Sequence, residues 1–142
     1  AIPMTLVTGV VDALKELQIK NLVVGTPYLD EINTKEAEFL NNKGFSILNI
    51  QGLNLTKGIE FGTVTPEYWI KFAQEINDES ADAIFLSCGG IRSTEVIAQI
   101  EQKVGKPVIT SNQAQMWSCL RRAGVNDKII GFGDLFNYRL TN

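Results

Sequence analysis

The chain has 142 residues, a hydrophobic share of 44% and a formal net charge of −3, with a pI near 5.0. This length predicts one domain, spanning residues 1–142, whose core is large enough to fold without disulfides. No apolar run approaches the ~18 residues of a membrane span, so we expect no membrane partner. The acidic balance also excludes a nucleic-acid platform, because binding phosphates needs a clustered basic face.

The chain contains no histidine and two cysteines, Cys88 and Cys119. The lack of histidine excludes Ser-His-Asp and Cys-His chemistry within the chain and removes the commonest transition-metal ligand. Proton transfer must therefore use thiol, tyrosine or carboxylate groups. The two cysteines have no metal-ligand spacing, so we expect no metal site, reduced thiols and a cytoplasmic protein. The chain begins at Ala1 rather than methionine, which suggests a processed, truncated or recombinant fragment.

Hydrophobic periodicity and turn residues predict helices and strands that alternate along the chain. Three positions carry helix-start signals: Asn33 with Glu36 resembles a capping box, Thr65 precedes a proline, and Asn112 is a candidate cap. The tail at 129–133 is predicted either to add an edge strand or to fold back over the site. We expect helices over about 5–17, 33–42, 65–76, 93–104 and 112–123, and strands over 21–24, 45–50, 83–86 and 107–110.

Strands that are each followed by a helix predict a three-layer α/β fold. We expect a flavodoxin-like parallel sheet of four strands, or five with the tail, and helices on both faces. In such sheets ligands bind beyond the carboxyl ends of the strands, so four loops should meet there. The second of them is long for this kind of unit, which often marks function. The four loops are 26–28, 52–60, 87–90 and 111–113.

Cys88 is the sharpest candidate for chemistry. It follows the apolar strand 84–86 and precedes Gly89 and Gly90, which let the backbone come close to a ligand. A helix expected to open near Ser93 would offer free N–H groups and its positive dipole end, so we expect the thiol to ionise easily. The alternative is a buried cysteine that only packs. For Cys119, within the last helix, we favour core packing.

Three other positions have two interpretations each. Tyr28 follows Pro27 at a strand tip, where its phenol would bind a carboxylate or would cover the sheet edge as a lid. Glu60 is either a base or a solvated loop carboxylate, and we favour the latter. Ser111 with Asn112 stays ambiguous, because helix capping already explains Asn112.

Four segments together resemble a known family, in order and over nearly the whole chain. They are Thr26 to Asn33, the loop from Gly52 to Glu67, Ser87 to Arg92, and Pro107 to Asn112. These segments resemble the arylmalonate decarboxylase and maleate cis-trans isomerase family of the aspartate/glutamate racemase superfamily, and specifically its C-terminal lobe.

The resemblance implies a cofactor-free and metal-free isomerase, racemase or decarboxylase that acts on small dicarboxylates. The family's catalytic cysteine falls on Cys88. The Thr-Pro-Tyr motif falls on Thr26 to Tyr28, and its tyrosine binds a substrate carboxylate. Backbone N–H groups at Cys88 and Gly89, beside Gly90, would hold that carboxylate or a developing enediolate, in agreement with the importance of preorganised donors in catalysis.

The resemblance also implies a second half that this sequence lacks. Family members have two similar lobes with the active site between them, and these 142 residues resemble the second lobe and the helix leading into it. The first lobe of the same polypeptide is therefore an expected partner, and a homo-oligomer is left open. Gly58 stands where isomerases have an asparagine, which favours the decarboxylase side. The alternative function is a non-catalytic flavodoxin-like module for ligand binding or signalling.

Overall fold

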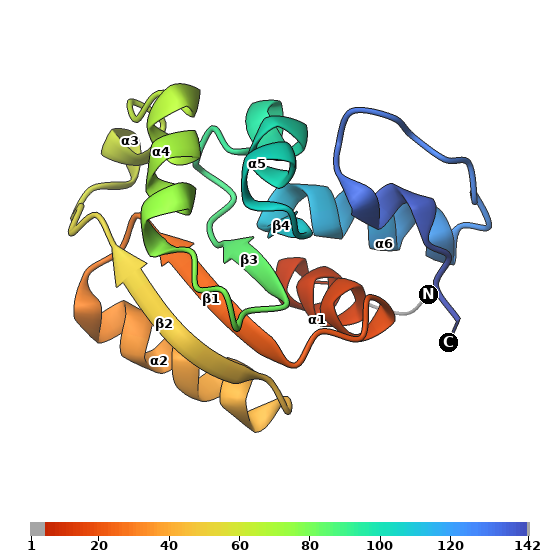
Figure 1. The fold of residues 1–142 in the computed structure, drawn as a ribbon, viewed down its shortest axis with the longest axis horizontal. Helices are drawn as coiled ribbons and strands as arrows, with labels where there is room; N and C mark the ends of the chain where they lie inside the picture. The colour runs from red at the N-terminus through yellow and green to blue at the C-terminus, as the bar shows by residue number, and fades with distance from the viewer. Residues whose placement is uncertain (1–4, 142) are drawn as a thin grey trace.

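Four parallel strands form the sheet of the protein, whose structure is a computed structural model describing residues 5–141 (Figure 1). The strands lie in the order β2-β1-β3-β4, and all of their pairings are parallel, which confirms the expected α/β architecture. Ala1 lies outside the described residues. The strands are β1 (Asn21–Thr26), β2 (Ser46–Gly52), β3 (Ala83–Leu86) and β4 (Val108–Thr110).

Helices cover both faces of this sheet, as Figure 1 shows. Alternation along the strands separates two apolar clusters, because Phe85 packs with Trp117 on one side while Ile84 packs with Trp69 on the other. In the described part of the chain, no helix is long and apolar enough to cross a membrane. The first cluster includes residues of α1 (Leu6–Glu16), α2 (Asp30–Asn42) and α6 (Ser111–Arg122), and the second includes residues of α4 (Pro66–Ile76) and α5 (Ile97–Val104).

One helix start is confirmed and two are wrong. Thr65 caps α4 by accepting the Tyr68 N–H, and Pro66 occupies the first turn. By contrast, α2 begins at Asp30, so Asn33 lies inside the helix and is buried. Thr110 is the cap of α6, where its hydroxyl accepts the Gln113 N–H and the Gln113 side chain accepts the Thr110 N–H. This reciprocal pair of bonds makes Thr110 a better cap than Asn112. The side chain of Asn112, two residues later, is therefore available for a different hydrogen-bond partner.

The tail after α6 adds no fifth strand to the sheet within residues 5–141. Instead, the buried guanidinium of Arg121 donates hydrogen bonds to carbonyl groups of the tail. The acceptors are the carbonyls of Val125, Asp127, Phe136 and Tyr138. A 3-10 turn at 134–137 closes this arrangement. The tail therefore lies against α6 near the β4 edge and does not cover the ends of β1 and β3 (Figure 1).

Candidate active site

The loops after β1, β2 and β3 are joined by backbone hydrogen bonds at the carboxyl end of the sheet. The Ser87 N–H donates to the Gly25 carbonyl at 2.9 Å, which extends the β1–β3 ladder past the end of β3. Leu53 and Asn54, after β2, donate their N–H groups to the carbonyls of Thr26 and Tyr28 at 3.1 and 3.2 Å. The expected meeting of these loops is thus confirmed, and it fixes the backbone on both sides of Tyr28.

Cys88 has a strained backbone and a buried side chain. Its φ of 125° lies in the left-handed region, which costs a non-glycine residue roughly 1–3 kcal/mol. The Cys88 N–H donates to the Ser111 hydroxyl at 3.0 Å, and the side chain is 8% exposed. In this structure the Ser111 hydroxyl accepts the Cys88 N–H, and binding of a substrate by that amide stays a prediction. This bond assigns Ser111 a role that the sequence left ambiguous.

The donor that faces the sulfur comes from the turn and not from a helix. The Gly90 N–H donates to Cys88 Sγ at 3.3 Å. The helix expected near Ser93 begins only at Ile97, after a 3-10 turn from Thr94. The dipole of that helix is therefore displaced from the thiol, and a single turn amide takes its place. Gly90 acts on Cys88 directly, whereas binding of a ligand by Gly89 stays a prediction.

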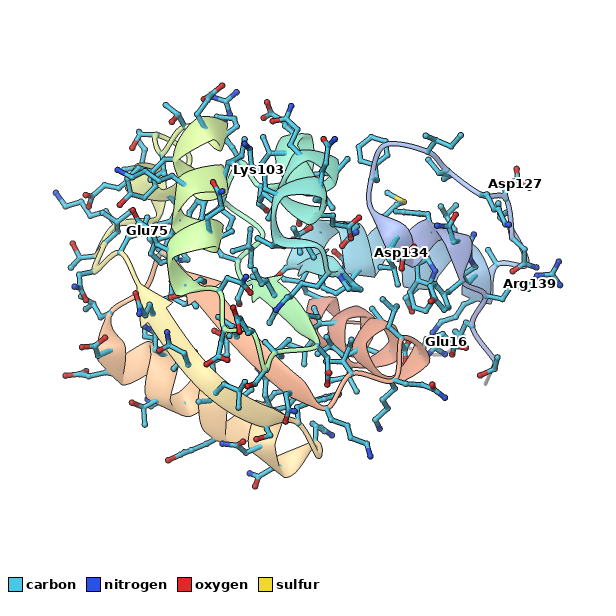
Figure 2. The ribbon with its side chains drawn as sticks, in the orientation of Figure 1. Glu16, Glu75, Lys103, Asp127, Asp134 and Arg139 are labelled. Carbon is cyan, nitrogen blue, oxygen red and sulfur yellow. The ribbon has the colours of Figure 1, made fainter. Side chains whose placement is uncertain are left out.

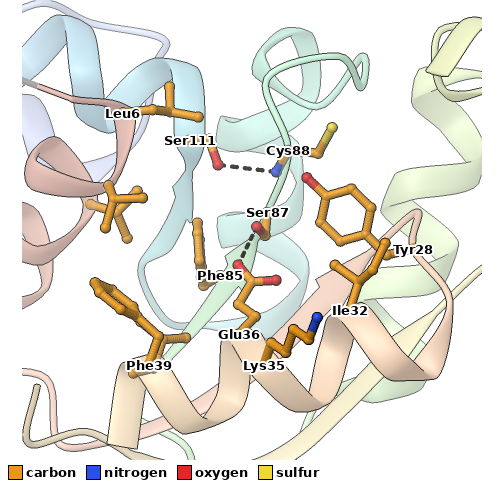
Figure 3. Close-up of a pocket in the computed structure, with 13 residues that line it drawn as sticks. Leu6, Tyr28, Ile32, Lys35, Glu36, Phe39, Phe85, Ser87, Cys88 and Ser111 are labelled. Atoms are coloured by element: carbon orange, nitrogen blue, oxygen red, sulfur yellow. Dashed lines mark hydrogen bonds between the residues drawn. The ribbon is translucent and has the colours of Figure 1, made fainter. Parts of the chain in front are cut away.

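Tyr28 lies beside this thiol, as Figure 3 shows, with its hydroxyl directed toward Cys88. Burial is the largest cause that raises the pKa of Tyr28, followed by the hydrogen bond to Cys88, the charge of Cys88 and the charge of Glu36. The phenol ring also packs edge to face against Phe61, with 5.7 Å between ring centroids. A phenol is already neutral at physiological pH, and the raised pKa keeps Tyr28 a neutral hydrogen-bond donor in more alkaline solution as well.

Thr26 positions Tyr28 and does not line the pocket. Its side chain is fully buried, donates to Asn33 Oδ1 at 2.5 Å and accepts the Tyr28 N–H at 3.1 Å. In this structure Thr26 is instead buried behind the turn, and contact of its side chain with substrate stays a prediction. The interior position of Asn33 in α2 explains the difference, because its side chain lies under the turn and takes the Thr26 hydroxyl as its partner.

A pocket of about 350 Å³ opens between α1, α2 and the end of β3. Apolar side chains from these elements form most of its wall, which suits an apolar group beside a small number of polar anchors. Figure 3 shows Phe85 and Phe39 on one side of it and Tyr28 on the other. The polar residues that line it are Tyr28, Lys35, Glu36, Ser87, Cys88 and Ser111.

Glu36 is a site residue that sequence reasoning missed. The Ser87 hydroxyl, one residue before the thiol, donates to Glu36 Oε1. Burial raises the pKa of Glu36, against the opposing effect of the Ser87 bond. The sequence paired Glu36 with Asn33 as a capping box. A helix starting at Asp30 would have placed Glu36 in one stripe with Ile32 and Leu40, four residues away on either side, and that spacing was the available signal.

The remaining candidates lie outside this pocket. Asn112 is exposed and its amide donates to the Gly89 carbonyl at 2.9 Å, so it fastens the glycine turn to α6. Glu60 accepts the Lys57 N–H at the start of the short helix α3 (Gly58–Phe61), a local role that does not involve the pocket. Cys119 is exposed, which makes the expected core packing wrong. Within residues 5–141, no cluster of three potential metal ligands is found.

Comparisons with known proteins identify relatives of this chain. A family model described as arylmalonate decarboxylase matches residues 2–136. The arylmalonate decarboxylase of Bordetella bronchiseptica is 30% identical over 139 residues, which cover 94% of this chain and 57% of that protein. The maleate isomerase of Alcaligenes faecalis is 25% identical over 130 residues, which cover 91% of this chain and 51% of that protein.

Solved structures share the fold. One is a cysteine-to-serine mutant of the Nocardia farcinica maleate cis-trans isomerase with a covalently bound succinylcysteine intermediate. It matches with a TM-score of 0.89 at 23% identity, over 92% of this chain and 54% of that chain. The present chain thus spans about half the length of the relatives it matches. The matched family model covers all of the residues that build the sheet and line the pocket, and the chain belongs to the arylmalonate decarboxylase family.

Proposed function

We propose that this chain is the cysteine-bearing lobe of a cofactor-independent enzyme that acts on small dicarboxylates. The observation that carries the proposal is the Tyr28 hydroxyl directed at Cys88 beside an apolar pocket (Figure 3). The Gly90 N–H reaches the same sulfur. Two donors on one sulfur stabilise negative charge there, so Cys88 can both give up a proton and accept one.

In a decarboxylation, one carboxylate leaves as CO₂ when its bond to the α-carbon breaks. The electron pair of that bond forms an enediolate with the remaining carboxylate, and the Cys88 S–H then transfers its proton to the α-carbon. The sulfur is left as a thiolate, stabilised by Tyr28 and Gly90, until water restores its proton. The apolar wall formed by α1, α2 and Phe85 supports a substrate whose α-carbon carries an apolar substituent.

An isomerisation would use the same sulfur as a nucleophile. The thiolate would add to one carbon of a double bond while a proton adds to the other, and rotation about the resulting single bond would precede elimination. A succinylcysteine, the state of the related isomerase named above, is the product of such an addition to a four-carbon unsaturated dicarboxylate. The apolar wall and Gly58 favour decarboxylation for this chain.

The length of the relatives supports a two-lobed enzyme. This chain covers between 51% and 57% of the two curated relatives. We propose that residues 1–142 form one lobe and that another lobe of the same polypeptide supplies the rest of the substrate contacts. The proposal is therefore tested by the reactivity of the Cys88 thiol and not by turnover, because these 142 residues alone would lack part of the active site.

The test is alkylation of Cys88 by iodoacetamide in a Cys119→Ser background, followed by mass spectrometry, with and without phenylmalonate. We expect Cys88 to be labelled and the dicarboxylate to slow the labelling, while the uncharged diamide of the same acid does not. Cys88→Ala provides the blank. A thiol that stays unlabelled in the folded protein, or one that no dicarboxylate protects, would overturn the proposal.

The 8% exposure of Cys88 favours a second candidate, a non-catalytic flavodoxin-like binding module in which the cysteine only packs. The same experiment separates the two. A packed cysteine would be labelled only as fast as the whole protein unfolds, and the rate would follow global stability across destabilised variants. A functional thiol would be labelled by a route independent of global unfolding.

A further inference from the structure

Glu36 occupies an unusual place in the pocket wall. It projects from α2 between apolar side chains, and its Oε1 accepts the Ser87 hydroxyl. Its Oε2 is buried and has no hydrogen-bond partner among the described residues. A buried oxygen without a partner is costly for a charged carboxylate and less costly for a neutral acid. The arrangement therefore favours the protonated form of Glu36, in line with the raised pKa of this carboxyl.

The charge of Glu36 reaches the hydroxyl that serves the thiol. Burial and the contacts with Cys88 are the larger causes that raise the pKa of Tyr28, and the negative charge of ionised Glu36 adds to them in the same direction. Figure 3 shows the second oxygen of Glu36 turned toward the side where Tyr28 and Lys35 lie. The titratable groups that line the pocket with Glu36 are Tyr28, Cys88 and Lys35. Lys35 is exposed and sits beside Glu36 on the same helix, where solvent screens its charge.

We propose that Glu36 is a specificity-determining residue of this pocket: as a neutral acid it admits an anionic group beside Cys88, and as a carboxylate it repels that group. The inference rests on the proposed function for the identity of the anion, a substrate carboxylate, but not for the electrostatics. Glu36 contacts Ser87 and acts on the ligand through its charge. Binding of an anion and binding of a proton to Glu36 therefore favour each other, and each raises the affinity for the other by the same factor.

The first experiment compares two alkylating reagents of similar size, anionic iodoacetate and neutral iodoacetamide, on Cys88 in the Cys119→Ser background. Each forms the same S–C bond and releases iodide, so ionisation of the thiol itself cancels in the ratio of their rates. As pH rises through the titration of Glu36, the ratio of iodoacetate to iodoacetamide rate should fall by about threefold to tenfold, a range set by one unit charge acting across a partly buried pocket.

Two variants make this comparison specific. Glu36→Gln keeps the size and the acceptor for Ser87 but cannot ionise, so its ratio should stay high and flat across the same pH range. Glu38→Gln removes the same formal charge from an exposed position on α2, and its ratio should still fall with pH. A flat ratio in the parent protein, or an equal fall in Glu36→Gln, overturns the proposal.

The second experiment needs neither alkylation nor a variant. The side-chain carboxyl carbon of Glu36 is titrated by NMR in the unsubstituted protein, with and without phenylmalonate. We expect the midpoint to lie above that of the exposed glutamates and to rise further when the dicarboxylate is present. An unchanged midpoint at saturating dicarboxylate overturns the inference even if Cys88 is protected from alkylation. If protection fails but the alkylation ratio falls with pH, the proposed function is overturned and the electrostatic role of Glu36 stands.

Discussion

A Cβ atom placed on Gly52 would stand 2.1 Å from the carbonyl oxygen of Tyr28. The same atom would lie 2.6 Å from Asn33 Nδ2 and 3.0 Å from the Thr26 hydroxyl oxygen. These neighbours belong to the backbone and buried side chains of the turn, so none of them can give way by changing rotamer. The absence of a side chain at the end of β2 is thus a condition for the position of Tyr28.

We predict that Gly52→Ala displaces the Tyr28 turn and separates its hydroxyl from Cys88. The strain should lower the free energy of unfolding by about 1–3 kcal/mol, the usual range for overpacking. The pKa of Tyr28 should fall back toward its ordinary value, because both burial and the contact with Cys88 weaken. Denaturant unfolding and NMR titration of the phenol carbon measure the two effects. Gly58→Ala is the control, since a Cβ there meets no atom within 4 Å.

The left-handed backbone of Cys88 predicts an unusual ranking of variants at the thiol position. At a φ of 125°, alanine retains the strain of the cysteine, whereas glycine adopts the conformation freely. Cys88→Gly should therefore be more stable than Cys88→Ala by roughly 1 kcal/mol. Thermal unfolding of the two variants checks the order. If Cys88→Ala proved the more stable, the backbone strain described above would be contradicted.

The hydrogen bonds that Asp82 accepts predict how the free energy of unfolding changes in acid. Its Oδ2 accepts the N–H groups of Asn21 and Lys20 at 2.8 and 3.0 Å, and these bonds, the first being the stronger, lower its pKa. A lowered pKa contributes stability that is fully present above the ordinary value of about 3.9 and is lost as pH falls through the value in the folded protein.

Replacement of Asp82 by alanine should accordingly cost about 1 kcal/mol at neutral pH, a modest figure because the side chain is exposed. The difference from the parent protein should shrink toward zero in acid. Urea unfolding at a series of pH values tests both statements. Glu79→Ala, an exposed neighbour, should show no comparable loss at neutral pH.

The hydrogen bonds of Arg121 predict that this side chain stabilises the tail. Its guanidinium donates to four carbonyls of residues 125–138. The Arg121 Cζ atom also lies 5.8 Å from the centroid of the Phe136 ring, which adds a cation–π interaction. Lysine keeps the charge, but its single ammonium group cannot donate to all of these carbonyls as the planar guanidinium does. Arg121→Lys should lower the free energy of unfolding by about 2–4 kcal/mol, since several carbonyls lose their partner. Hydrogen exchange should accelerate across 125–138, whereas Arg139→Lys, at an exposed position (Figure 2), should leave it unchanged.

Local sequence patterns predicted the sheet well, because strand and helix periodicity are short-range signals. The expected strands agree with the observed ones to within about two residues. The two asparagines that were wrongly predicted as helix caps depend on long-range contacts instead. Asn33 and Asn112 both carry cap chemistry, yet their partners are Thr26 and Gly89, which come from other loops. Nothing within a few residues of either asparagine indicates those partners.

The site was predictable in its two central residues and not in its surroundings. Cys88 and Tyr28 follow strand ends that a parallel sheet must bring together, so their proximity follows from topology. Glu36 was missed because its burial depends on where α2 begins. The position of Cys119 depends on which face of α6 is covered. Trp117 and Arg121 define the covered face, and Cys119 points away from it.

The ladder between β1 and β3 has a consequence for cooperativity. Val24 pairs with Phe85, Gly25 pairs with Leu86, and the Ser87 amide continues the same row of bonds. The phenol and the thiol thus lie two residues beyond the ends of two adjacent interior strands. A sub-global opening that frays the tail would leave their spacing intact, whereas fraying of the outer strand β2 would release the Leu53 and Asn54 bonds that hold the Tyr28 turn. Slowest amide exchange should accordingly coincide with the paired segments of β1 and β3 that precede Tyr28 and Cys88, and the spacing of the two side chains should survive any opening confined to the tail.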